Sequence, residues 1–328
     1  PGGSSLGEGN LVVPAPKPQY GGTVVVGLEA EATGMRPWED ACANSCYTMV
    51  GQIFDPLLRQ ARSGDYLPYL AESIVPNDDF TVWTVTIRSG ITFSNGKAVS
   101  AQTYEDMWPI QQGGSSAAGT IATAGLINVE ATGDFTIDYT LSATNVAFPS
   151  FLSFATIGYV FDPEAAADSD AFNANPIGTG PFVLESRDID NETVLVRNPN
   201  YWLSINGRQL PYLDSMVYRP IPDETTRLAA LAAGTTSAME SRRQATVRDA
   251  RSLEGVTLYE FQGNDAGGGH FNAQVPPYDD VRVRRGLTLA NNQEAVIEAL
   301  GGAGISEPVT QMFSKDSPWY SQAVADSY

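Results

Sequence analysis

The chain of 328 residues is long enough for two or more domains, and its composition, 42% hydrophobic and 17% charged, is that of an ordinary globular protein. The charge is unusual, because 38 Asp and Glu residues against 19 Lys and Arg residues give a formal net charge of -19. This acid excess argues against a basic face for nucleic acid, and no apolar run approaches the ~20 residues that span a bilayer.

The beginning of the chain is rich in Gly, Pro and Ser, a composition that predicts a flexible tether over residues 1–18. A frayed terminus or a remnant of cloning is the alternative interpretation. The first residues are polar and lack both a basic start and an apolar core. We therefore expect that any signal peptide has already been removed.

The first predicted strand is Gly21–Leu28 (GGTVVVGL), a β-branched run bounded by glycines. A polar loop, Glu29–Asp40, follows it, and apolar residues then recur at helical spacing in Tyr47–Leu58. Phe80–Val99 contains an alternation with a period of two, which predicts a strand. Val82, Thr84 and Thr86 alternate there with Trp83, Val85 and Ile87. Asn95-Gly96 in the same stretch is the strongest hairpin signal in the chain.

Strands and helices mix along the rest of the chain. Ser100 is placed to cap a helix that Pro109 ends or kinks. Further strands are predicted at Ile127–Leu141 (a pair around Gly133-Asp134), Pro181–Arg197 (a hairpin with its turn at Asp188–Asn191), Met216–Ile221 and His270–Asn272. Further helices are predicted at Thr225–Ala233 (capped by Asp223 and followed by Gly234), Val281–Leu289 and Gln293–Leu300. This order predicts an α/β fold with some antiparallel sheet.

The two cysteines, Cys42 and Cys46, are four residues apart. On a regular helix their Cβ atoms would lie ~5–6 Å apart, whereas a disulfide needs ~3.5–4.5 Å. A disulfide therefore needs a loop or an irregular helix start, which Pro37 nearby favours, and two buried thiols are the alternative. If the protein is exported, we expect the disulfide. No second Cys or His pair is present to complete a tetrahedral metal site.

Motifs for catalysis are missing from the sequence. It contains no G-x-S-x-G, P-loop or H-E-x-x-H motif, and Gly178-Thr179-Gly180 is followed by proline and a predicted strand where a dinucleotide-binding motif needs a helix. His270 is the single histidine. Glu29 and Glu31 form a carboxylate pair that a glycosidase would need, but solvated loop acids are the simpler interpretation. We expect no enzyme and no cofactor.

Several segments, in order along the chain, resemble one known family. They are GGTVVVGLEAE (21–31), WTVTIRSGITFSNGKAVSA (83–101), NPIGTGPFVL (175–184), VLVRNPNYW (194–202), LDSMVYRPIPDETTRLAALAAG (213–234) and FNAQVPPYDDVRVRRGLTLANNQEAVIEALGGAG (271–304). They resemble the extracytoplasmic solute-binding proteins of peptide-type ABC importers, the oligopeptide, dipeptide and nickel-binding family. The resemblance implies a bilobed, periplasmic-binding-protein-like α/β fold of type II with an inserted subdomain.

The resemblance also implies a domain order. Family members continue well beyond Ser317–Tyr320, so we expect the chain to correspond to an N-terminal portion with an incomplete second lobe that by itself binds solute weakly or not at all. The hairpin of 175–202 is expected to be scaffold of the first lobe. The expected divisions are a tether (1–18), lobe I (19–38 and 175–268), an inserted α/β subdomain (39–174) and the start of lobe II (269–328).

The candidate ligand-binding residues follow from the same resemblance. In family members the exit of the first strand contributes backbone and a polar side chain to the ligand, and the matching positions are Glu29, Ala30 and Glu31. An extended peptide can pair with such a strand end through main-chain hydrogen bonds. Glu31 is the first candidate for binding a cationic amine. Trp38 is placed to stack on a sugar or an aromatic side chain, with a core position as the equal alternative.

The segment that the resemblance places between the lobes is Gly267–Gln274. Its glycines would leave the wall of the cleft open, so Gly269 and His270 are further candidates for ligand contact. An interior, hydrogen-bonded His270 is the alternative. A lone imidazole is not expected to hold nickel.

The resemblance implies the partners and the location. We expect a peptide or another small solute as ligand and the transmembrane subunits of an ABC permease as partners, with no nucleic acid. The expected location is extracytoplasmic, in the periplasm or at the cell surface, and a lipid anchor upstream of residue 1 is an open alternative. An oligosaccharide on the same fold is the second interpretation, and a carboxylate-based hydrolase is a remote third.

Overall fold

The computed structural model describes residues 18–40, 44–61, 63–153, 155–260, 270–313, 315 and 319–326. They divide into two units. The first unit runs up to Asp223 and includes Thr235–Met239, and the second consists of Glu224–Gly234 and the residues from Glu240 onward. The lobe and subdomain boundaries predicted from the sequence stay predictions.

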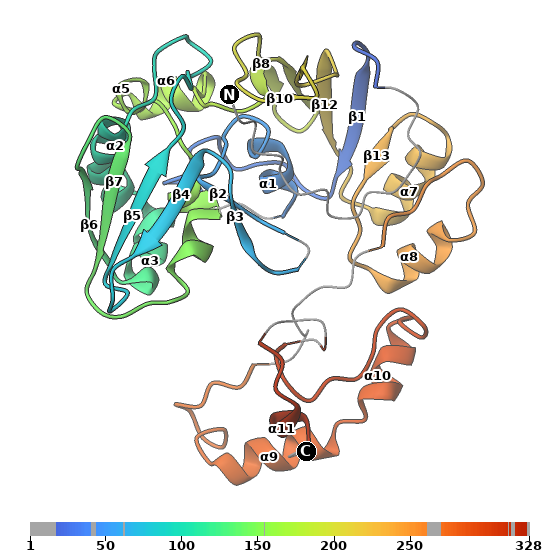
Figure 1. Cartoon of the computed structure of the whole chain (residues 1–328). Coiled ribbons are helices and arrows are strands. Elements are labelled where there is room, and N and C mark those ends of the chain that lie inside the picture. Colours follow the sequence, from blue (N-terminus) through green and yellow to red (C-terminus); the bar gives the residue numbers. More distant parts are fainter. Residues whose placement is uncertain are drawn as a thin grey trace. The chain divides into compact units, whose positions relative to one another are not determined.

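The first unit contains a five-stranded sheet in the order β13-β1-β12-β9-β8 (Figure 1). Its strands are β1 (Thr23–Leu28), β8 (Phe182–Asp188), β9 (Glu192–Arg197), β12 (Ser215–Pro220) and β13 (Ala238–Met239). β1 lies parallel between β12 and β13, and β9 is antiparallel to both β12 and β8. β1 therefore pairs with strands from 175–268, the stretch that the sequence analysis assigns with it to lobe I.

A second, antiparallel sheet of four strands has the order β4-β5-β7-β6. Its strands are β4 (Ala71–Pro76), β5 (Val82–Ile87), β6 (Leu126–Ala131) and β7 (Thr136–Leu141). Every second residue of β5 and β7 is buried, which confirms the period of two. The buried side chains are Trp83, Val85, Ile87, Ile137, Tyr139 and Leu141. They join one core with residues of β1 and of the segment after it.

Helix α2 (Ala101–Gly113) packs against β6 and β7 of this second sheet. Ser100 is its N-cap, as predicted, and the Ser100 N–H donates to Thr103 Oγ1 at 3.1 Å. Pro109 does not end the helix, which continues to Gly113. The proline lies on the exposed side, whereas Met107 and Trp108 are buried, so its ring meets solvent and not the core.

The apolar run Tyr47–Leu58 does not form one helix. α1 (Asn44–Val50) ends at Val50, and β2 (Leu58–Gln60) begins at the end of the run. The carbonyl groups in between accept hydrogen bonds from a distant segment. Gly180 N donates to Ile53 O at 2.8 Å, and Phe182 N donates to Gln52 O at 3.0 Å.

The remaining short elements of the first unit are α3 (Ser115–Ala124), a 3₁₀-helix (Phe148–Ser153), α4 (Ala155–Gly158), α5 (Pro163–Ala166), α6 (Ser169–Ala174), β3 (Tyr66–Pro68), β10 (Ser204–Ile205) and β11 (Arg208–Gln209).

The second unit is helical where the structure describes it. Its helices are α7 (Glu224–Ala232), α8 (Gln244–Ala250), α9 (Val281–Ala290), α10 (Gln293–Ala299) and α11 (Gln322–Ala325). Gly234 has a φ of 73°, the left-handed conformation expected after α7. The strand predicted at His270–Asn272 is wrong, because these residues are exposed and none of them belongs to a strand.

The segment before β8 packs directly on the backbone after α1. A Cβ atom on Gly178 would lie 2.2 Å from Ile53 O, and a Cβ atom on Gly180 would lie 2.5 Å from Gln52 O. Downstream of the hairpin, buried Asn198 donates to Gly180 O at 2.8 Å. The Trp202 indole N–H donates to Asp55 Oδ2 at 2.9 Å. The β8–β9 hairpin is therefore fastened to the segment after α1 both before β8 and after β9.

This close approach predicts an effect of single methyl groups. Gly180→Ala should lower the free energy of unfolding by about 1–3 kcal/mol, the usual cost of overpacking a filled site. The matched control is Gly119→Ala in α3, where a Cβ atom meets nothing within 4 Å. This control should raise stability by about 0.5–1 kcal/mol, because Ala favours a helix over Gly. Urea unfolding measures both changes, and equal losses at the two positions would contradict the packing described.

Candidate functional site

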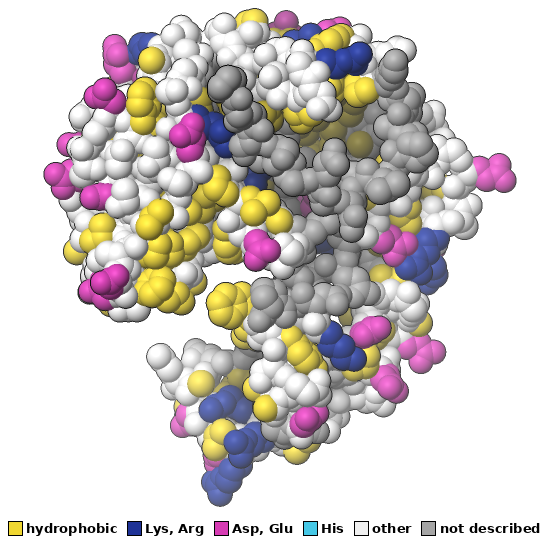
Figure 2. All heavy atoms as spheres, in the orientation of Figure 1, with side chains coloured by type: hydrophobic (Ala, Val, Ile, Leu, Met, Phe, Trp, Pro, Cys, Tyr) yellow, Lys and Arg dark blue, Asp and Glu magenta, His cyan; other side chains and the backbone are white. Residues whose placement is uncertain are grey.

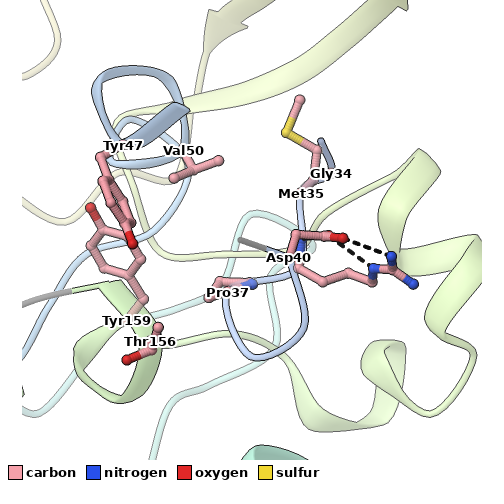
Figure 3. Close-up of a pocket in the computed structure, with 9 residues that line it drawn as sticks. Gly34, Met35, Pro37, Asp40, Tyr47, Val50, Thr156 and Tyr159 are labelled. Atoms are coloured by element: carbon pink, nitrogen blue, oxygen red, sulfur yellow. Dashed lines mark hydrogen bonds and ion pairs between the residues drawn. The ribbon is translucent and has the colours of Figure 1, made fainter. Parts of the chain in front are cut away.

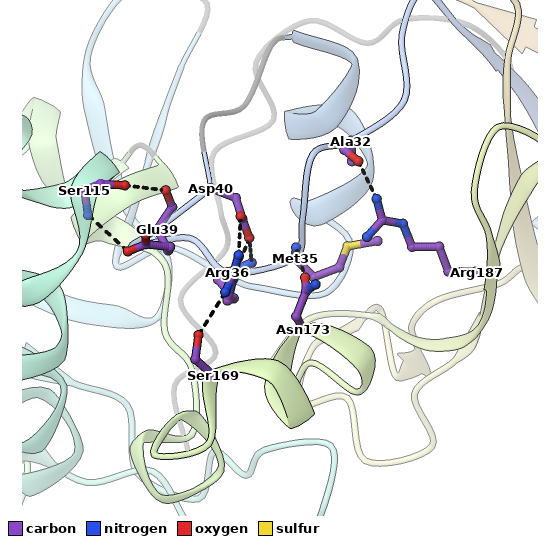
Figure 4. A network of polar contacts seen from close by, with 9 residues as sticks. All are labelled: Ala32, Met35, Arg36, Glu39, Asp40, Ser115, Ser169, Asn173 and Arg187. Atoms are coloured by element: carbon purple, nitrogen blue, oxygen red, sulfur yellow. Dashed lines mark hydrogen bonds and ion pairs between the residues drawn. The ribbon is translucent and has the colours of Figure 1, made fainter.

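The loop that follows β1, residues 29–40, is held by polar contacts to three separate parts of the first unit (Figure 4). Near its start, Arg187 of β8 donates through Nη2 to Ala32 O and lies 3.4 Å from Glu31 Oε1. In the middle, Met35 N donates to Asn173 Oδ1 of α6 at 2.8 Å. These two contacts come from residues more than a hundred positions away, so tertiary structure fixes this part of the loop.

Arg36 and Asp40 form the central ion pair of this loop. Arg36 donates through Nε to Asp40 Oδ2 at 2.9 Å and through Nη2 to Asp40 Oδ1 at 2.8 Å, and its Nη1 reaches Ser169 Oγ at 3.0 Å. Burial acts to raise the pKa of Asp40, but the hydrogen bonds from Arg36 outweigh it and hold that pKa below its ordinary value. The pair is thus charged and mutually neutralised at neutral pH.

The end of the loop is fastened to the start of α3. Ser115 N donates to Glu39 Oε2 at 3.1 Å, and Ser115 Oγ donates to Glu39 O at 2.9 Å. Trp38 is 4% exposed, and its ring lies 4.4 Å from that of Phe161 and 4.9 Å from that of Phe172. Of the two roles left open for Trp38, the structure supports the core position, because a buried indole among other rings presents no face to a ligand.

A small hollow lies beside this loop, and we call it the tyrosine hollow (Figure 3). Its lining residues are Gly34, Met35, Arg36, Pro37, Asp40, Tyr47, Val50, Thr156 and Tyr159. The cavity volume is about 10 Å³, room for roughly one water molecule. Tyr47 and Val50 come from α1, and Thr156 and Tyr159 come from α4 and the residue that follows it. The loop therefore forms one side of the hollow and two short helical segments form the other.

The tyrosine hollow is neutral at physiological pH. Burial raises the pKa of Tyr159 to about 12, and burial also raises the pKa of Tyr47, so both phenols keep their protons. The two charged lining residues, Arg36 and Asp40, neutralise each other. A neutral group no larger than the one water molecule that the hollow has room for would meet phenol rings and hydroxyl groups there. A free ammonium or carboxylate group would find no opposite charge left uncompensated in this lining.

The structure separates the residues predicted at the strand exit. Glu29 is exposed, Ala30 is half-buried, and the Glu31 side chain is 18% exposed and paired with Arg187. Glu31 Oε1 also accepts a hydrogen bond from Ala32 N at 3.1 Å. Glu31 therefore helps to hold its own loop, and Glu29 is the carboxylate at the strand exit that faces solvent.

The other predicted residues lie apart from this loop. His270 is exposed and belongs to the second unit, and Gly269 is outside the described residues. Cys46 is buried and disulfide-bonded, while Cys42 is outside the described residues, so their pairing stays a prediction. Sequence reasoning missed Tyr47 and Tyr159, both of which are half-buried in the structure. A partly buried phenol usually has a polar partner for its hydroxyl, and that tendency was the available signal.

The surface charge is spread out. On the face that Figure 2 shows, the described Asp and Glu side chains are scattered and do not gather in one area. In the described part of the chain, no helix is both long and apolar enough to cross a membrane. The described residues also contain no group of three or more His, Cys, Asp or Glu side chains placed to hold a metal ion.

Comparison with known families identifies the class of protein. The profile described as "Bacterial extracellular solute-binding proteins, family 5 Middle" matches residues 65–328, which is most of the chain. The protein belongs to this family. The resemblance recognised in the sequence is thereby confirmed, and so is the α/β, periplasmic-binding-protein-like fold class, on the solved structures below.

Individual relatives are named for different ligands. Heme-binding protein A of Haemophilus influenzae is 30% identical over 280 residues, which cover 78% of this chain and 50% of that protein. The dipeptide-binding protein of Escherichia coli is 31% identical over 179 residues, which cover 53% of this chain and 32% of that protein. The chain thus spans half or less of the length of these relatives.

Solved structures share the fold. The oligopeptide-binding protein AppA from Bacillus subtilis, in complex with a nonapeptide, gives a TM-score of 0.75 at 22% identity and covers 93% of this chain and 60% of that one. The periplasmic binding protein DppA from Helicobacter pylori, in complex with a peptide, gives a TM-score of 0.75 at 21% identity. The match covers 94% of this chain and 65% of that one. These likenesses establish the fold.

The ion pair in the loop predicts a measurable loss. Arg36→Ala should lower the free energy of unfolding by about 1–3 kcal/mol, because it removes several hydrogen bonds to a charged group and leaves Asp40 without its partner. Since the pKa of Asp40 is lowered in the folded state, its contribution is present above the ordinary value of 3.8 and is lost as the pH falls through and below it. The deficit of the variant should therefore shrink in acid.

Thermal unfolding of the wild type and the variant at neutral and at acid pH measures this difference. The matched control is Arg248→Ala, whose partner Asp249 is half exposed and whose pair should contribute almost nothing. A deficit at Arg36 that is no larger than the one at Arg248, or that grows in acid, would overturn the role given to this pair.

Proposed function

We propose that the protein captures a small solute outside the cytoplasm, most simply a short peptide, and delivers it to the transmembrane subunits of an ABC permease. The observation that carries this proposal is the family match over residues 65–328. The relatives support the peptide class, since one is named a dipeptide-binding protein and solved neighbours hold peptides. The absence of catalytic motifs from the sequence supports binding without reaction.

The solute site proposed in the first unit combines two features. The strand exit at Glu29 and Ala30 offers main-chain groups to an extended peptide and a solvent-facing carboxylate to a cationic amine. The tyrosine hollow beside the same loop offers phenol rings and hydroxyl groups to a neutral group of the solute. Because polar contacts hold the loop in place, these groups are presented with little ordering cost.

Mass spectrometry of the molecules released by denaturing the protein, purified from the cell envelope of its own host, tests this function. We expect short peptides. Release of sugars or of another class of molecule would contradict the peptide assignment, and no released solute together with no peptide binding would contradict solute capture. Tyr47→Ala should reduce the amount of released solute, whereas Tyr20→Ala, at a side chain that is 50% exposed, is the matched control and should not.

A further inference from the structure

The buried Asp55 is an acid with little compensation for a charge. Its side chain is fully buried. Oδ2 accepts one hydrogen bond, from the Trp202 indole, while Oδ1 has no hydrogen-bond partner among the described residues. The nearest cation is Arg59, whose Nη2 lies 3.7 Å from Oδ1 and whose side chain is 51% exposed. A buried carboxylate is normally stable only with several donors or a close, dry ion pair.

The hydroxyl groups of Thr179 and Tyr69 also act to lower the pKa of Asp55, but less than the Trp202 indole and Arg59 do, so the compensation for a charge stays partial. The Arg59 guanidinium lies over the Tyr69 ring, 3.7 Å from its centroid, and the Tyr69 and Tyr201 hydroxyls share a hydrogen bond of 2.6 Å. The titratable and charged groups facing Asp55 or Trp202 are Arg59 on β2, Tyr69 after β3, Arg88 after β5, Tyr104 on α2, Tyr159 after α4 and Tyr201 after β9. The tyrosines among them have raised pKa values and stay neutral, so Asp55 is the group in this cluster that titrates.

The direction of the titration follows from burial. Burial raises the pKa of Asp55 to about 7, and the hydrogen bond from Trp202 and the charge of Arg59 reduce this rise without cancelling it. A raised pKa in the folded state means that the protonated form is the stable one. Its contribution to stability is complete below the unfolded value of 3.8 and is lost as the pH rises through about 7.

The backbone of the same residue leads to the tyrosine hollow. Asp55 O accepts a hydrogen bond from Val160 N at 3.1 Å, and Leu57 N donates to Gly158 O at 3.3 Å. These bonds enclose an antiparallel bridge between Pro56 and Tyr159. The Tyr159 ring also stacks on Phe54, with 6.0 Å between centroids. Segment 54–57 therefore positions a residue that lines the hollow.

We propose that Asp55 and Trp202 form a pH-sensitive latch: protonated Asp55 keeps segment 55–57 firmly bridged to 158–160, and ionised Asp55 loosens that bridge and with it the wall of the tyrosine hollow. An effect on solute affinity rests on the proposed function. A protein of an extracellular family meets the pH of its surroundings, so a buried acid that titrates near neutrality responds to that pH directly.

Amide hydrogen exchange of Leu57 and Val160 tests the latch without any ligand. In the wild type, protection of both amides should fall about tenfold between about pH 6 and about pH 8, the change expected when one proton is bound only in the closed state. Asp55→Asn keeps the shape and the acceptor for Trp202 but cannot ionise, so its protection factors should not change with pH. Equal pH dependence in the wild type and in Asp55→Asn would overturn the latch.

A matched control separates this effect from general acid sensitivity. Asp162 is also buried, but Lys97 lies 3.1 Å from its Oδ2. Asp162→Asn should keep the wild-type pH dependence at Leu57 and Val160, and a flat profile in this variant would overturn the assignment to Asp55. Trp202→Phe removes the indole donor, and the fall in protection should then begin at a higher pH because the carboxylate has lost the strongest of its donors.

Solute binding by the protein purified from its own host provides the second measurement, with the tripeptide tri-alanine as probe. Its affinity for the wild type should fall by about the same factor over the same pH range, and its affinity for Asp55→Asn should stay constant. If protection changes with pH but the affinity of a bound probe does not, the coupling to the hollow is overturned. If no peptide binds at either pH, the proposed function fails, and the exchange data alone decide whether the latch exists.

Discussion

The close packing of Gly178 and Gly180 on the backbone of Gln52 and Ile53 is the contact on which the first unit depends. It leaves no room for a side chain, so the segment before β8 donates its amides directly to the carbonyls after α1. The bonded carbonyls lie just after the end of α1, and two residues further on Asp55 accepts the hydrogen bond from the Trp202 indole. The hairpin, which was predicted to be scaffold, thereby shapes the region next to the candidate site.

Local patterns predicted most strands and helices, because their signals lie within a few residues. The alternation in β5 and the turn residues of the β8–β9 hairpin are examples. The site was harder to predict. The partner of Glu31 is Arg187, and the partner of Met35 N is Asn173, both more than a hundred residues away, so neither contact leaves a local trace. The sequence was compatible with either a core position or a ligand contact for Trp38, and its burial in the structure supports the core position.

The structure and the family give a consistent account of a binding protein. A strand leads out of the sheet into a loop in which Glu31 is paired with Arg187 and Arg36 with Asp40, while Glu29 keeps a solvent-facing carboxylate. The loop and the tyrosine hollow beside it offer a solute main-chain groups, this carboxylate, phenol rings and hydroxyl groups. The loop itself is rich in acids, with Glu29, Glu31, Glu39 and Asp40 against the single cation Arg36.

The most direct test of this account is a crystal structure of the protein purified from its own host, together with any solute that it retains. The account predicts electron density for the solute against the strand exit at Glu29 and Ala30, with one neutral group at the hydroxyls of Tyr47 and Tyr159. Density for the solute elsewhere in the first unit, with the strand exit and the tyrosine hollow untouched, would contradict it.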